Sequence, residues 1–174
     1  MAKKMRKMLG RIDSPECIAL MRLIETQSKE TLAKWAAGYA KERYLPIYAA
    51  NGEEECFARA VAACEAHFAG EMKLAELKSA LKAAREGAAK VEHPTAQAAA
   101  RAVATACAVI MTPTNALGYL FYGAAAFAYC EAGLDETIEM YEALASQELE
   151  RALDSLRAVA VEHEPNPAKI DWNC

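Results

Sequence analysis

Cysteine and histidine are the side chains of this 174-residue chain best suited to nucleophilic chemistry. Cys64 and His67 lie three residues apart in a helical pattern, so the thiol could contact an imidazole that activates it. The same periodicity places Cys64 in an apolar stripe and His67 at the solvent edge of that stripe, and this structural interpretation is favoured. A hydrolase that uses this pair is therefore the weakest of three functional hypotheses.

Metal sites in helical bundles need ligands that share one helix face, as in Glu-x-x-His or His-Glu-x-x-His. The sequence contains neither motif, and its three histidines lie on separate segments. Its six cysteines form no Cys-x-x-Cys pair, which favours reduced, buried thiols in the cytosol. Glycine-rich phosphate loops and Gly-x-Ser-x-Gly are also absent. We therefore expect no catalytic residue, no metal and no cofactor, and we predict that the protein is not an enzyme.

The charges are distributed unevenly along the chain, whose net charge is −4. Residues 1–12 form a basic arm, and the rest of the chain is acidic; the cations of the arm are Lys3, Lys4, Arg6, Lys7 and Arg11. The arm lacks the aromatic residues of single-strand binders, and an acidic body repels phosphate backbones. We expect the arm to be solvated or to form the polar face of a short helix, and nucleic acid not to be a partner.

A second charged feature is a run of acids between Glu131 and Asp154, which includes Glu148 with Arg151 three residues further on. Such a run is usually a solvated helix face. Between residues 131 and 142, however, the acids have no basic neighbour in sequence, and tyrosines lie nearby. Complementary charge speeds association, so this region is the candidate docking surface for a basic protein. The candidate residues are Glu131, Asp135, Glu136, Glu139, Glu142, Tyr119 and Tyr122.

The elements that must position these residues are helices, because alanine is abundant and glycine and proline are few. No window alternates as a strand does. Apolar spacing and caps predict seven helices at about 15–27, 28–48, 53–70, 74–90, 94–111, 114–132 and 135–159. Ser14 and Ser28 cap the first two, and Asp135 caps the last, whose inward face begins with Ile138. We predict an all-α fold: an irregular bundle or array of about seven helices in one domain, 1–174, with an extended tail at 163–174 that Ile170 and Trp172 anchor.

Residues 102–130 carry no charge, which raises the question of a membrane span. Thr112, Pro113 and Asn115 interrupt this stretch, and each half is too short and too rich in alanine to cross a bilayer well. We therefore expect two buried helices at the centre of the fold, no membrane association and a cytoplasmic protein. Small residues, including Gly118 and Gly123, would let these helices approach closely. Exposed helix surfaces that are rich in alanine and glycine are compatible with a homodimer.

Four segments of the sequence occur in an order that is typical of one known family. The segment 35–48, Trp-Ala-Ala-Gly-Tyr-Ala-Lys-Glu-Arg-Tyr-Leu-Pro-Ile-Tyr, resembles one of its helices. Gly-Glu-Met-Lys-Leu at 70–74, Ala-Ala-Ala-Arg-Ala at 98–102 and Thr-Asn-Ala-Leu-Gly at 114–118 follow in the same order. Over residues 30–155 the chain is similar to the immunity-protein-5-like family linked to polymorphic toxin systems. The motif positions without an assigned role are Trp35, Arg43, Arg101, Thr114, Asn115 and Gly118.

The resemblance implies an all-helical cytosolic protein that binds and neutralises a toxin by covering its surface, without catalysis. It also contains a departure, because histidines are common in the family where this chain has Thr105, Met111 and Asn115. Any task of those histidines is one that this chain cannot perform. The second hypothesis, which follows from the helical architecture, is a small-ligand-binding or regulatory module with a pocket between the helices at 94–111 and 114–132.

Overall fold

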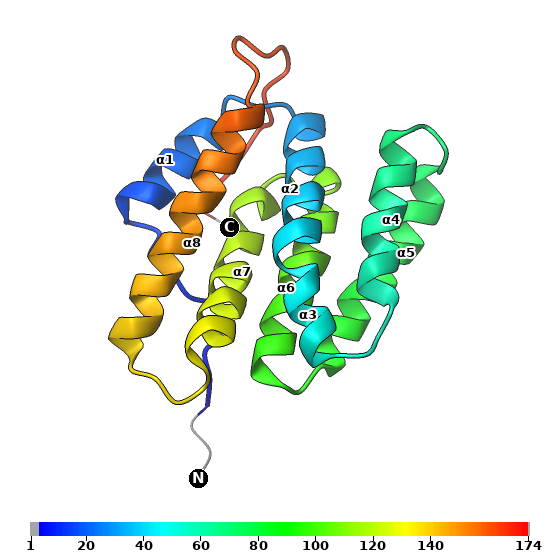
Figure 1. Cartoon of the computed structure of the whole chain (residues 1–174). Coiled ribbons are helices and arrows are strands. Elements are labelled where there is room, and N and C mark those ends of the chain that lie inside the picture. Colours follow the sequence, from blue (N-terminus) through cyan, green and yellow to red (C-terminus); the bar gives the residue numbers. More distant parts are fainter. Residues whose placement is uncertain (1–3, 174) are drawn as a thin grey trace.

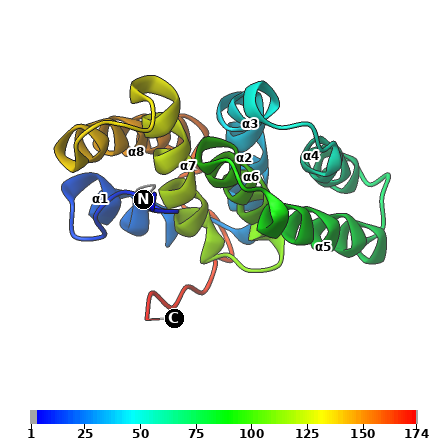
Figure 2. The same cartoon turned by 90° about the horizontal axis from the view of Figure 1, so that it is seen from below.

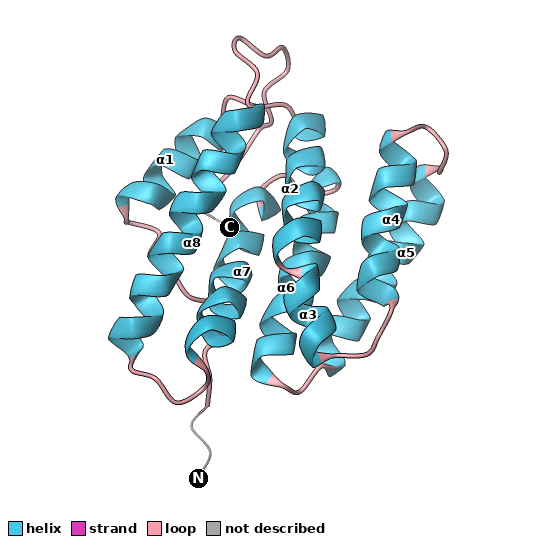
Figure 3. Ribbon diagram, in the orientation of Figure 1, coloured by secondary structure: helices cyan, strands magenta, loops and turns pink. Residues whose placement is uncertain are grey.

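The structure, a computed structural model, describes residues 4–173 and is built from helices and loops, with no named strand in that range (Figure 3). The all-α prediction is confirmed. The helices are α1 (Pro15–Ile24), α2 (Lys29–Arg43), α3 (Leu45–Asn51), α4 (Cys56–Phe68), α5 (Leu74–Lys90), α6 (Pro94–Cys107), the 3-10 turn η1 (Ala108–Ile110), α7 (Asn115–Ala132) and α8 (Ile138–Val159).

Two helices, α6 and α7, form the centre of the array. Figure 1 shows α1 and α8 at one edge and α4 and α5 at the opposite edge, and the view from below places α6 and α7 between them (Figure 2). Alanines fill the contact; Ala99, Ala102, Ala124 and Ala128 are completely buried. Because alanine side chains are small, the two helix axes can approach closely at these positions.

Side-chain caps explain the starts of four of the eight α-helices in the described range. Ser14 and Ser28 accept hydrogen bonds from the backbone N–H groups of Cys17 and Thr31, as Ser at an N-cap does. The last helix differs from the prediction, because its N-cap is Thr137, whose hydroxyl accepts from the N–H of Met140, and not Asp135. Thr137 is the N-cap because it directly precedes Ile138, the first helical residue.

The predicted helix at 28–48 divides in two at Tyr44, which ends α2 and begins α3. Pro46 lies at the start of α3, where its missing N–H costs no hydrogen bond. This division gives eight α-helices in the described range instead of about seven. The consequence is that Tyr44 sits at a bend, where its side chain enters the core and is completely buried.

The basic arm is attached to the bundle and is not helical. The N–H of Leu9 donates to the carbonyl of Phe121 at 3.1 Å, and the Tyr129 hydroxyl donates to the carbonyl of Arg6 at 2.7 Å. Leu9 itself is buried. The expected short helix is therefore wrong for residues 4–12. The cations Lys4, Arg6, Lys7 and Arg11 are exposed, as in a solvated arm, and Lys3 lies outside the described residues.

The C-terminal tail closes against the start of α2. Glu164 accepts hydrogen bonds from the N–H of Ser28 at 2.8 Å and from the hydroxyls of Ser28 and Thr31 at 2.7 and 2.6 Å. The N–H of Ala168 donates to the carbonyl of Gln27 at 2.8 Å. Ile170 and Trp172 pack against the core, which confirms the expected anchors. The tail thus supplies a second cap for α2 from more than 130 residues away.

We predict that Glu164→Ala lowers the free energy of unfolding by about 1 kcal/mol at neutral pH, the usual value of a helix cap. Burial raises the pKa of Glu164, but the hydrogen bonds from Thr31 and Ser28 lower it by more, so the net pKa is below the usual value. The stabilisation is therefore fully present above the ordinary carboxyl pKa and is lost as the pH falls through the lowered one.

Urea unfolding of the wild type and the variant between about pH 7 and pH 3 measures this difference. Glu162→Ala is the control, because Glu162 is exposed and makes no hydrogen bond or ion pair in the described range. A difference between wild type and Glu164→Ala that stays constant over this pH range would contradict the assignment.

Candidate functional site

The centre of the molecule holds one carboxylate that no solvent reaches. Glu148, on α8, has an exposed fraction of 0%. Its Oε2 accepts hydrogen bonds from the hydroxyls of Tyr39 at 3.0 Å and Tyr44 at 2.9 Å. Sequence reasoning placed Glu148 in a solvated acidic run, and the structure corrects this. Burying a charged group is costly unless it is paired and hydrogen-bonded, so this position needs its partners.

Two arginines complete the surroundings of this carboxylate. Arg43 Nη2 and Arg151 Nη1 lie 2.7 and 3.1 Å from Glu148 Oε1. Both guanidinium groups also lie over the ring of Phe127, 5.5 and 5.2 Å from its centroid, which is cation–π geometry. Unlike the carboxylate, both arginines reach the surface. We call Glu148, Tyr39, Tyr44, Arg43 and Arg151 the Glu148 network.

Local structure explains how these groups meet. Tyr39 and Arg43 are four residues apart and lie on one face of α2. Tyr44 follows at the bend into α3, and Gly123 of α7 leaves room for its ring, because a Cβ at that position would overlap the ring. Glu148 follows Ala145 by three residues on the inward face of α8. The network therefore joins α2, α3 and α8 across α7.

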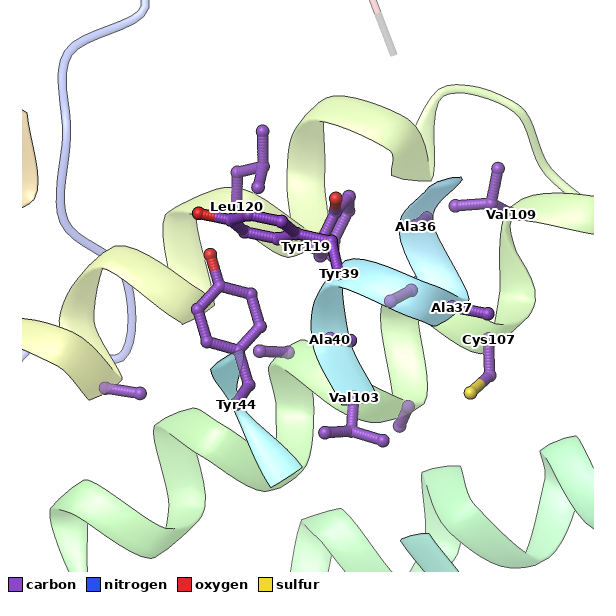
Figure 4. Close-up of a cluster of buried hydrophobic side chains, with 14 of the residues drawn as sticks. Ala36, Ala37, Tyr39, Ala40, Tyr44, Val103, Cys107, Val109, Tyr119 and Leu120 are labelled. Atoms are coloured by element: carbon purple, nitrogen blue, oxygen red, sulfur yellow. The ribbon is translucent and has the colours of Figure 1, made fainter. Parts of the chain in front are cut away.

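An aromatic cluster surrounds the tyrosines of the network (Figure 4). The Tyr119 ring packs edge-on against Trp35 and Tyr44, with centroids 5.4 and 6.2 Å apart. Burial raises the pKa of Tyr44 and of Tyr119 well above the usual value, and burial followed by the Glu148 charge raises the pKa of Tyr39. These hydroxyls therefore stay protonated at neutral pH, and those of Tyr39 and Tyr44 act as donors to Glu148.

The contacts of the Glu148 network fit a structural role. Glu148 accepts four hydrogen bonds, and no nucleophile lies among its partners. Trp35 reinforces the same junction, since its Nε1–H donates to the hydroxyl of Ser155 on α8 at 2.8 Å. Two of the motif residues, Trp35 and Arg43, thus hold α2 against α8. We assign the network to stability rather than to acid–base catalysis.

The proposed catalytic pair is not assembled. The Cys64 thiol donates to the carbonyl of Cys107 at 3.5 Å, while His67 Nδ1 lies 3.0 Å from the carbonyl of Met72. No hydrogen bond joins the Cys64 thiol to the His67 imidazole in the described part of the chain. The sequence also predicts that the cysteines are buried. This prediction is wrong for Cys130, which is exposed. Cys174 lies outside the described residues.

The acidic candidates are gathered where α7 turns into α8, the yellow loop in Figure 1. Glu131, Asp135, Glu136 and Glu139 are exposed there. Glu142 differs, because its Oε1 lies 3.6 Å from Arg6 Nη1 of the docked arm, a partner that the sequence spacing did not reveal. Four of the five acids thus keep their charge free of any ion pair within residues 4–173.

The two tyrosines proposed for the same surface behave differently. Tyr122 is half-buried, whereas Tyr119 is completely buried and its hydroxyl has no hydrogen-bond partner in the described structure. Tyr119 therefore cannot line a docking surface, and the sequence-based assignment is wrong for it. Tyr119 lies one turn before Gly123 and faces the centre of the array. Helix α7 is apolar on all sides, so its sequence does not distinguish the inward face from the outward one.

Three large apolar side chains are exposed among these acids. Leu134, Ile138 and Met140 have exposed fractions of 36%, 38% and 46%. The periodicity placed Ile138 in the core stripe of its helix, but it is the first residue of α8 and lies beyond the packed part. Apolar side chains rimmed by charges are typical of protein contact sites. We call residues 131–142 the α7–α8 corner.

The remaining motif positions lie around the start of α7. Thr114 is its N-cap residue, and Asn115 lines a groove beside α5 together with Thr105 and Met111. Gly118 has no atom of another residue near its Cβ position. Arg101, on α6, has a buried Nε that makes no hydrogen bond in the described structure. Thr105, Met111 and Asn115, which the sequence comparison singled out, thus line the same groove.

Within the described residues, neither a metal-binding cluster nor a membrane-spanning helix is present. No group of three or more His, Cys, Asp or Glu side chains within residues 4–173 is arranged to hold a metal ion. None of the helices in this range combines the length and apolar character needed to cross a bilayer.

Fold and site together define an all-helical protein whose buried charges hold its helices in register. One known family has a sequence profile that matches residues 22–159, and its description is Imm-5 like putative immunity protein. No curated protein and no solved structure matches the chain. Because the match covers most of its length, the chain belongs to the Imm-5 like family, and the resemblance inferred from its motifs is confirmed.

We predict that Glu148→Ala lowers the free energy of unfolding by about 3–5 kcal/mol, because it leaves two guanidinium groups and two hydroxyls without their acceptor. Glu150→Ala, two residues away on the exposed face of α8, should change it by less than about 0.5 kcal/mol. Urea unfolding monitored by circular dichroism measures both. Similar small effects of the two substitutions would show that the network does not hold the helices together.

A second prediction compares two glycines of α7. Gly123→Ala should destabilise the protein by about 1–3 kcal/mol, because the new methyl group overlaps the Tyr44 ring and forces it from Glu148. Gly118→Ala should stabilise it by about 0.5–1 kcal/mol, because no atom opposes the methyl group and alanine favours the helix. Thermal unfolding of the pair separates packing from helix propensity, and equal shifts would refute the packing argument.

Proposed function

We propose that this protein is an immunity protein, which binds a bacterial toxin in the cytoplasm and neutralises it by covering its surface, without catalysis. The observation that carries the proposal is membership of the Imm-5 like family over residues 22–159. The Glu148 network agrees with it, because its strongly interacting side chains are occupied within the protein and keep the fold rigid. A rigid surface loses little conformational entropy when a partner binds.

The α7–α8 corner is our proposed docking surface. Glu131, Asp135, Glu136 and Glu139 have no ion pair in the described structure, so their charge is available to a partner. The exposed Leu134, Ile138 and Met140 supply apolar area that a partner could bury. This combination fits a toxin with a basic surface, since opposite charge speeds the encounter and apolar contact slows dissociation.

A second candidate function is a small-ligand-binding module. A groove lined by cations and hydroxyl groups beside α5 favours it, and it concerns a different face of the protein. A homodimer stays a prediction that the single chain does not address.

The test uses the product of the gene next to the one that encodes this chain as the toxin. Co-expression of the wild-type protein should restore growth, and the two purified proteins should associate. Glu136→Lys combined with Glu139→Lys should weaken the Kd by about tenfold or more, mainly through slower association, because two attractive charges become repulsive. Growth assays and surface plasmon resonance measure these effects.

A matched control changes the same charge on the same helix. Glu150→Lys combined with Asp154→Lys lies on α8 outside the corner and removes only an exposed ion pair with Arg157. It should leave protection and affinity unchanged. Equal losses in both double variants would eliminate the corner as the docking surface, and a wild-type protein that neither binds nor protects would eliminate the immunity function.

A further inference from the structure

A groove runs along α5 where this helix meets the end of α6 and the start of α7. Its volume is about 460 Å³, within the usual range for small-molecule sites. The apolar residues of its lining are Leu81, Ala104, Ala108 and Met111. Leu81 and Ala104 are buried in the core, whereas Met111 is 40% exposed. A ligand with an apolar portion could bury it here.

Three cations stand on one wall of the groove. Lys78, Lys82 and Arg85 are spaced by four and three residues, which places them on the same face of α5. No acid lines the groove. Of the three, only Lys82 has an ion pair in the described structure, a loose one with Glu86 at 3.8 Å. The positive charge of this wall is therefore largely uncompensated, although the whole chain is acidic.

Neutral polar groups line the opposite side. The side chains of Thr105, Thr112 and Asn115 make no hydrogen bond with another described residue. Asn115 is also the first residue of α7, so the positive end of an 18-residue helix lies at the groove. Three cations and three neutral polar side chains thus surround the apolar part of the groove, and no carboxylate lies among them.

We propose that this groove binds a small organic anion. The phosphate or carboxylate group of the ligand lies against Lys78, Lys82 and Arg85, where charge-assisted hydrogen bonds are strong. The apolar or aromatic part covers Leu81 and Met111, and Thr105 and Asn115 fix its orientation. This site is separate from the α7–α8 corner and does not depend on the proposed toxin.

Isothermal titration of the full chain with four probes tests the proposal: pyrophosphate, citrate, adenosine monophosphate and adenosine. Saturable one-to-one binding of an anion, with no binding of neutral adenosine, is expected. Pyrophosphate or adenosine monophosphate as the tighter ligand assigns a phosphate group, and citrate as the tighter ligand assigns a carboxylate. If none of the three anions binds with a Kd below about 1 mM, the proposal is wrong.

Variants locate the binding. Lys82→Gln combined with Arg85→Gln should weaken the Kd by about tenfold or more, because two charge-assisted contacts are lost. Lys29→Gln combined with Lys34→Gln removes the same charge from exposed positions of α2 and should leave the Kd unchanged. Equal weakening in the two double variants would show attraction by overall charge and overturn the proposal.

Two further variants separate this site from the docking surface. Asn115→Ala should weaken the Kd of the anion by about threefold to tenfold without a change of net charge, because one hydrogen bond is lost. Glu136→Lys combined with Glu139→Lys should leave the affinity for the anion within about twofold. An unchanged Kd in Asn115→Ala together with a stronger effect of the corner variant would overturn the assignment to the groove.

Discussion

The structure depends on the burial of one carboxylate. Glu148 lies where α2, α3 and α8 approach α7, and its charge requires donors because no water reaches it. Tyr39 and Tyr44 supply them from the core side, and Arg43 and Arg151 from the surface side. A shift of any of these helices along its axis would separate donor from acceptor. Aliphatic contacts tolerate such shifts, so the network defines the register that the alanine-rich contacts leave open.

The centre of the array places a second constraint on the fold. Alanine contacts between α6 and α7 leave little room for larger side chains. One aromatic cluster lies beside this contact, between α2 and α7, and consists of Trp35, Tyr39, Tyr44 and Tyr119. Gly123 is the position where this matters most, because Tyr44 occupies the space that a Cβ would fill. Close packing at the centre and the position of the buried carboxylate are therefore linked through one ring.

The sequence predicted the fold class, the serine caps and the apolar stripes, because each depends on neighbours within about one helical turn. It did not reveal the Glu148 network. Glu148 follows Ala145 by three residues and precedes Ala152 by four, so periodicity alone places it inward, but a charged side chain in an acidic run is ordinarily exposed. Its donors on α2 are more than 100 residues away. The sequence also did not reveal the burial of Tyr119 or the pairing of Glu142 with Arg6, because these contacts too join residues far apart in the chain.

The two proposed surfaces carry opposite charge and lie on different helices, and this separation follows from the fold. The cations belong to α5, which lies at one edge of the array, while the acids of the α7–α8 corner belong to α7, α8 and their loop, nearer the other edge (Figure 1). If these groups were adjacent, they would neutralise one another as exposed ion pairs and attract nothing. The packed α6–α7 centre keeps them apart. A protein with net charge −4 can therefore present a basic groove to a small anion and an acidic corner to a basic protein.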